Sequence, residues 1–284
     1  MFISIRDACV PSWELTGELS EHYVSFTVRP FVYQELAEYA HLLGKVVTIT
    51  DYLIWGGFPR RLELSSESSL RSYISEVMEC LLSQIIARHG IRRDERFRHL
   101  AGFLFQSSGQ MLSARTVGRH MEEAGFPCSP TTATRYISHL EEAGAITRVR
   151  RYSTKAGREL EYYLKFYNTD VALRTIASPD GRRDLPRNLE NAVYNELLFR
   201  NYRIQTYDRG SGSVDFVALK GDRKLFIQTA RSVVEDETYR RKFGPFAKLD
   251  NSCPKILISN DDLDYTTSTV QHIRFRDLVL MDDL

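Results

Sequence analysis

Residues 129–144 read SPTTATRYISHLEEAG, a stretch that carries helix signals at both ends. The hydroxyl of Ser129 can accept a hydrogen bond from a backbone N–H of the first turn, and Pro130 suits the first helical position, where no N–H is needed. Gly144 is a typical helix stop. Apolar side chains recur at helical spacing between these ends, at Ala133, Ile137 and Leu140. The stretch therefore predicts one amphipathic helix.

The polar face of this predicted helix carries short or basic side chains. They are Thr131, Thr134, Arg135, Ser138 and His139. A helix that enters a DNA groove shows such a face to base edges and phosphates. We therefore expect residues 129–144 to form a recognition helix.

Two further helices are expected ahead of it, over residues 95–107 and 113–125, because both segments repeat apolar side chains at helical spacing. The short turn of residues 126–128 then leads into the recognition helix, which is the layout of a helix-turn-helix. Residues 145–152 alternate like a strand, and residues 160–166 read as the strand that returns after a polar tip. Three helices and a basic hairpin predict a winged helix, placed at residues 95–176.

The candidate DNA contacts fall into two groups. Side chains of the recognition helix are expected to face base edges, namely Thr134, Arg135 and Ser138. Side chains of the hairpin are expected to contact phosphates, namely Arg148, Arg150, Arg151 and Lys155. Since fold alone does not fix function, DNA binding is an expectation that rests on these side chains.

Composition limits the other possibilities. The chain has 284 residues and a formal net charge of +1, which predicts about two domains and confines any nucleic-acid surface to a local patch. The four cysteines form no CxxC pair, and the seven histidines are dispersed along the sequence, so no zinc site and no histidine-based site is expected. No apolar run approaches the ~20 residues of a membrane span, and no signal peptide is recognisable. We expect a cytoplasmic protein without a membrane partner.

Residues 185–284 predict a second unit with the order α-β-β-β-α-β. Helices are expected at residues 189–201 and 235–249. Strands are expected at residues 202–207, 213–219, 224–230 and 255–259, and a final strand follows near residues 270–275. This order is that of the restriction-endonuclease-like core, so the fold class expected for the whole chain is mixed α/β.

Several strings together resemble the C-terminal region of a family of prokaryotic AAA-type P-loop ATPases. They are FISIRDA at 2–8, YVSF at 23–26, PFVYQE at 30–35, YLIWGGFP at 52–59, KFYNTD at 165–170, LENAVYNEL at 189–197 and VDFV at 214–217. Two positions depart from the family pattern: Glu21-His22 replaces a Gly-Arg pair, and Ser213 replaces an acidic residue.

The resemblance implies a chain with four parts. Residues 1–60 correspond to the end of the ATPase domain, 61–94 to a helical connector, 95–176 to the winged helix and 185–284 to a nuclease-like domain. The sequence contains no GxxxxGK[ST] string, so no ATP site and no ATP hydrolysis are expected. Residues 1–40 read as two strands and a helix, a piece of sheet whose edges need partners from elsewhere.

The nuclease-like layout points to three candidate catalytic residues, Glu190, Asp215 and Gln228, of which Glu190 and Asp215 would hold Mg²⁺. Ala230 stands where the catalytic lysine of such nucleases would be. Two carboxylates without that lysine predict a chemically silent core. On a purely structural interpretation, Glu190 favours the start of a helix and Asp215 borders a turn.

The sequence therefore predicts a non-catalytic DNA-binding or regulatory protein that needs no cofactor, with double-stranded DNA as its partner. Two alternatives stay open. One is an Mg²⁺-dependent nuclease that uses Glu190, Asp215 and Gln228. The other is an interaction subunit that completes a separate P-loop ATPase through residues 1–40, or that forms a homo-oligomer.

Overall fold

The computed structural model describes residues 27–152, 164–179, 181, 183–208, 213–249, 251–281 and 284. Structural statements below concern these residues. The strands expected within residues 1–26 and the hairpin tip with Lys155 lie outside them.

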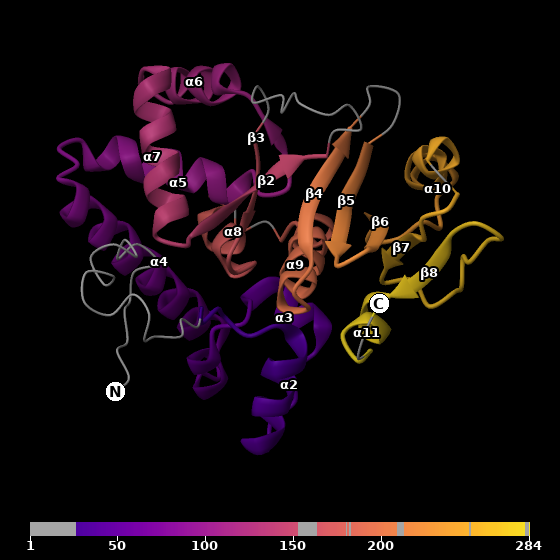
Figure 1. The fold of residues 1–284 in the computed structure, drawn as a ribbon. Helices are drawn as coiled ribbons and strands as arrows, with labels where there is room; N and C mark the ends of the chain where they lie inside the picture. The colour runs from indigo at the N-terminus through magenta and orange to yellow at the C-terminus, as the bar shows by residue number, and fades with distance from the viewer. Residues whose placement is uncertain are drawn as a thin grey trace, which may run out of the picture.

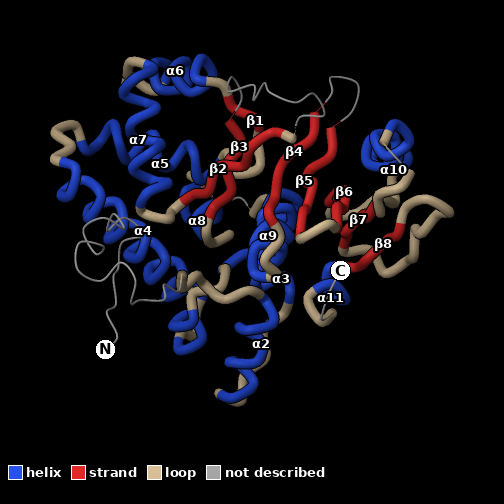
Figure 2. The backbone as a smooth tube through the Cα atoms, viewed as in Figure 1, coloured by secondary structure: helices blue, strands red, loops and turns tan. Residues whose placement is uncertain are grey.

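The first described part is helical (Figures 1 and 2). It consists of α2 (Tyr33–Leu42), α3 (Ile49–Trp55), the 3₁₀ turn η1 (Pro59–Glu63) and α4 (Glu67–His89). Ser66 caps α4 by accepting from the N–H of Ser69, and Gly90 ends it in the left-handed region at φ 58°. None of the described helices is long and apolar enough to cross a membrane.

A compact group of three helices and three strands follows. Its elements are α5 (Asp94–Gln106), β1 (Met111–Leu112), α6 (Ala114–Glu123), α7 (Pro130–Glu142), β2 (Ile146–Arg151) and β3 (Leu164–Asn168). Strand β3 pairs antiparallel with both β1 and β2. The three expected helices are confirmed, with Ser113 capping α6 and Ser129 capping α7.

The apolar faces expected on these helices form one core. Leu100 of α5, Val117 of α6 and Leu140 of α7 are all fully buried in it. Burying these stripes is what holds three short helices together, since isolated helices of this length are marginal in water.

The last part alternates strands and helices. After α8 (Ala172–Ala177) come α9 (Leu185–Phe199), β4 (Arg203–Asp208), β5 (Ser213–Lys220), β6 (Arg223–Thr229), α10 (Asp236–Phe243), η2 (Gly244–Lys248), β7 (Lys255–Ser259), β8 (Gln271–Arg274) and α11 (Phe275–Leu278). The expected order is present, although the helix expected at 235–249 stops at Phe243. A 3₁₀ turn with Pro245 at its start takes over there, because proline cannot continue the α-helical hydrogen bonds.

A single eight-stranded sheet joins the two strand-containing parts, in the order β1-β3-β2-β4-β5-β6-β7-β8. The junction is a parallel pairing of β2 with β4, in which Arg150 faces Gln205 and Arg151 faces Thr206. Strand β2 was expected to form one side of a projecting hairpin. At Arg150 and Arg151 it is instead an internal strand of the sheet, with β4 as its neighbour. Its open edge is covered by β4, which removes an unpaired strand edge.

Neighbouring residues of the central strands point to opposite faces of the sheet. Phe216 packs with α9, α2 and α3 in one cluster, whereas Val217 packs with η2 in another. Figure 1 shows α9 running beside β4 and β5, with α2 and α3 below it. The fold is thus mixed α/β, with a helical region beside an eight-stranded sheet.

Two of the strings on which the family resemblance rests meet at Asp170. Gly57 donates its N–H to Oδ2 of Asp170 at 2.7 Å, and Ala172 donates to Oδ1 at 2.8 Å. Gly56 has φ 69°, and a Cβ there would lie 1.6 Å from Oδ1 of Asp170. Both glycines are therefore required by close packing, and at Gly56 also by its backbone conformation.

Candidate functional sites

The outer face of α7 is polar, as expected. Thr131, Thr134 and Arg135 are exposed, and Ser138 is half-buried. The opposite face packs into the core through Ala133, Tyr136, Ile137 and Leu140. The three expected base-contacting side chains therefore lie on the side of α7 away from the core.

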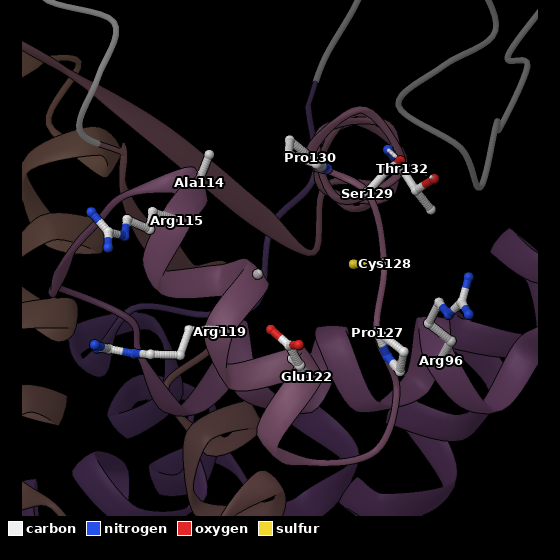
Figure 3. Close-up of a pocket in the computed structure, with 11 residues that line it drawn as sticks. Arg96, Ala114, Arg115, Arg119, Glu122, Pro127, Cys128, Ser129, Pro130 and Thr132 are labelled. Carbon is white, nitrogen blue, oxygen red and sulfur yellow. Dashed lines mark hydrogen bonds between the residues drawn. The ribbon is translucent and has the colours of Figure 1, made fainter.

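A basic depression of about 800 Å³ lies where α6 meets the start of α7. Figure 3 shows Arg115 and Arg119 of α6 on one side of it, Arg96 on the other, and Cys128 between them. Arg115 and Arg119 are exposed, and Arg119 lies 3.9 Å from Glu123, a surface pair that is worth little. Burial raises the pKa of the Cys128 thiol, and the positive charge of Arg96 opposes that rise.

Two of these arginines, Arg115 and Arg119, were not expected from the sequence to contact DNA. A signal was present: Arg115 and Arg119 are four residues apart, so they share one face of α6. Val117 and Met121 occupy its buried face.

The arginines of the expected hairpin are less accessible to a phosphate than expected. Arg148 donates to both carboxylate oxygens of Glu141, at 3.0 and 2.7 Å, and its guanidinium lies over the ring of Phe166. A phosphate would have to compete with that bidentate pair. Arg150 is exposed and Arg151 half-buried, both beside β4.

The three residues expected from the nuclease layout do come together, in one buried cluster of charges. Asp215 accepts from Nζ of Lys242 at 2.8 Å and from the backbone N–H of Thr229 at 2.8 Å. The same Nζ lies 3.4 Å from Oε1 of Gln228. Glu190 accepts from the hydroxyl of Tyr167 at 2.6 Å and pairs with Lys165 at 2.9 Å.

The expectation of a cluster without a lysine needs correction. Ala230 does occupy the expected lysine position, but Lys242 of α10 and Lys165 of β3 bring two ammonium groups from other elements. Lys165 stood in the string KFYNTD, whereas no sequence signal marked Lys242. Glu190 also does not start a helix, because α9 begins at Leu185 with Asp184 as its cap.

The electrostatics of the cluster follow from its burial. Burial alone would raise the pKa of the Asp215 carboxyl, but the ammonium groups of Lys242 and Lys165 outweigh it and hold that pKa below its ordinary value. The pKa of Tyr167 is raised well above its usual range by burial and by the charges of Glu190 and Asp215. Two carboxylates thus face two ammonium groups, and Tyr167 stays a protonated hydrogen-bond donor.

A serine, a histidine and an aspartate also meet at β7 and β8, in an orientation that does not suit catalysis. Nδ1 of His272 accepts from the N–H of Tyr265, so its other nitrogen, Nε2, carries the proton toward Oγ of Ser259, 2.9 Å away. Ser259 in turn donates to Asp261. A catalytic base would have to accept from the serine instead.

Comparison with known proteins gives a match over part of this chain. Residues 47–183, from just before α3 to the segment after α8, match a domain of unknown function, DUF8612. An uncharacterized protein of Haemophilus influenzae is 25% identical over 241 residues, which cover 82% of this chain and 60% of that protein. The chain thus spans little more than half the length of that relative. No solved structure matches the chain.

Proposed function

We propose that this protein binds double-stranded DNA through α6 and α7, and that the unit from α5 to β3 is a winged helix. The observation that carries the proposal is the basic depression at the start of α7, beside the exposed polar face of the same helix. The order of three helices and three strands supports it as well.

The roles of the side chains follow from where they lie. Thr134, Arg135 and Ser138 would face base edges in the major groove. Arg96, Arg115 and Arg119 would neutralise phosphates beside the first turn of α7, whose backbone N–H groups also favour an anion. Arg148, Arg150, Arg151 and Lys155 remain proposed phosphate contacts on the adjoining strand and hairpin, with Arg148 weakened by its pairing to Glu141.

We further propose that the chain derives from the C-terminal region of AAA-type ATPases, acts in the cytoplasm, and carries a silent nuclease-like core. Lys242 and Lys165 support the proposed lack of nuclease activity, because each already neutralises a carboxylate that would otherwise hold Mg²⁺. The side chains of Lys242 and Lys165 are themselves 11% and 8% exposed, which leaves little room for the hydrated ion.

Fluorescence anisotropy of a labelled mixed-sequence duplex tests the DNA proposal. The double variant Arg115→Ala/Arg119→Ala is expected to bind about tenfold more weakly, irrespective of duplex sequence, because it removes phosphate contacts. The matched control Arg60→Ala/Arg276→Ala removes the same charge from exposed, ion-paired arginines of η1 and α11. Equal loss in both variants, or no binding by the unchanged protein at low salt, would refute the assignment.

A magnesium-dependent nuclease is the second candidate, because Glu190, Asp215, Gln228 and Lys242 do converge. If the core is silent, plasmid DNA stays intact with Mg²⁺ and excess protein. Cleavage that disappears in Asp215→Asn would establish the nuclease instead and assign Lys242 a catalytic role.

The interaction-subunit alternative is favoured by exposed apolar side chains at and around α2. They are Val28, Leu42 and Val46, at 93%, 81% and 91% exposure. A partner ATPase chain or a second copy that covers them would be seen as a mass increase in light scattering, lost in Leu42→Asp/Val46→Asp.

A further inference from the structure

Two histidines that are 50 residues apart in the sequence meet at the ends of α4 and α7. His89 is the last residue of α4, and His139 lies in the last turn of α7. Their rings stack at 3.6 Å between centroids, with 19° between their planes. Glu142, three residues after His139, shares the same side of α7. These two histidines are dispersed in the sequence, and the fold brings them together.

The donor atoms of these three side chains converge. Oε2 of Glu142 lies 3.6 Å from Nε2 of His89 and 3.7 Å from Nδ1 of His139. One ligand atom from each side chain lies within 4.8 Å of the others. Nδ1 of His139 is buried and has no hydrogen-bond partner among the described residues. A buried polar atom without a partner is costly, so this nitrogen calls for a ligand.

We propose that His89, His139 and Glu142 bind one divalent transition-metal ion, for which Zn²⁺ is the best-suited candidate. Two imidazoles and a carboxylate are a known Zn²⁺ donor set, in which a water takes the fourth position. Ligands at about 2.0–2.2 Å in a tetrahedron lie about 3.3–3.6 Å apart, close to the 3.6 and 3.7 Å that separate Oε2 of Glu142 from the two imidazole nitrogens. Among the described residues, no other histidine, cysteine and carboxylate groups converge in this way.

The surroundings allow the ion to enter. The side chains of His89 and His139 are 21% and 14% exposed, and that of Glu142 is 45% exposed. Solvent therefore reaches the carboxylate side, where a water ligand would bind. Because the lone pairs of the two rings lie in nearly parallel planes, one imidazole must turn out of the stack about its Cβ–Cγ bond to point at the ion.

A bound ion would fasten the C-terminal end of α4 to that of α7. These helices already contact one another, and α7 carries the proposed base-contacting face. The metal proposal does not depend on DNA binding, since it rests only on the three donor side chains. A second histidine pair, His99 with His120, packs against Phe103 and Phe126 instead, which is an apolar setting for imidazoles rather than a donor set.

Titration of the tag-free, full-length, chelator-treated protein with Co²⁺ tests the site. Tetrahedral coordination is expected to give visible absorption that saturates at about one equivalent per chain and is displaced by Zn²⁺. Glu142→Gln and His139→Gln are expected to abolish this absorption, whereas His41→Gln, a change at an exposed histidine on α2, is expected to keep it.

Thermal unfolding provides the second readout. Zn²⁺ is expected to raise the melting temperature of the unchanged protein and of His41→Gln, but not that of Glu142→Gln. The Glu142 side chain is more exposed than either histidine, so its variant is expected to fold even if a histidine variant does not. Absence of visible absorption in the unchanged protein, or its persistence in Glu142→Gln, would overturn the proposal.

Discussion

Gly56 and Gly57 allow the N-terminal helices to pack closely against the segment before α8. A Cβ at Gly57 would lie 1.8 Å from the carbonyl oxygen of Phe31, and one at Gly56 would enter the carboxylate of Asp170. Two adjacent glycines shortly before a proline favour a turn in the string YLIWGGFP. The string could not reveal that the partner of the turn is Asp170, more than a hundred residues away.

Gly56→Ala is expected to destabilise the protein by about 3 kcal/mol, since it combines a left-handed backbone with a clash against a buried carboxylate. Gly221→Ala is the matched control, because Gly221 has φ +56° but no atom within 4 Å of an added Cβ. The control is expected to cost about 1 kcal/mol. Urea unfolding measures both, and equal losses would contradict the packing argument.

The buried carboxyl of Asp170 is expected to make the free energy of unfolding depend on pH. Burial raises the pKa of its carboxyl to about 6, although two backbone N–H groups and Arg61 oppose the rise. The folded state therefore binds this proton more tightly than the unfolded chain, whose aspartate has a pKa near 3.9. The contribution of this carboxyl to the free energy of unfolding is fully present below about pH 4 and is lost as the pH rises to about 6. The change amounts to about 3 kcal/mol.

Asp170→Asn is expected to flatten the stability curve between pH 4 and pH 7, because the asparagine does not titrate. The measurement is the free energy of unfolding across that range for both proteins. Curves of the same slope would show that another group carries the dependence.

At the scale of elements, the helices α5 to α7 were predictable and the sheet junction was not. Caps such as Ser113 and Ser129 and apolar repeats are local signals. The pairing of β2 with β4 joins strands far apart in the chain, and an alternating pattern does not name its neighbour. The same limit hid Lys242 and the meeting of His89 with His139.

The ion pair between Lys165 of β3 and Glu190 of α9 couples two elements that the sequence assigned to different units. Lys165→Met is expected to cost about 3–5 kcal/mol, because it leaves the Glu190 charge buried without its partner. Adding Glu190→Gln is expected to restore much of that loss. A double-mutant cycle in denaturant measures the coupling, and strictly additive losses would contradict it.

At the scale of the whole molecule, a chain of net charge +1 has no general attraction to DNA, so binding has to come from a local patch. The basic depression is lined by residues of α5, α6 and the start of α7, whereas the lysine–carboxylate cluster comes from β3, α9, β5, β6 and α10, and the two share no residue. The two sites can therefore be altered separately, and loss of the cluster's charges is not expected to abolish DNA contact.

The salt dependence of duplex binding tests the central claim most directly. The logarithm of the association constant is expected to fall linearly with the logarithm of salt concentration, and Arg115→Ala/Arg119→Ala is expected to make that slope shallower by about two units, one per lost phosphate contact. A slope that is unchanged in this variant, or no salt dependence at all, would contradict DNA binding through α6 and α7.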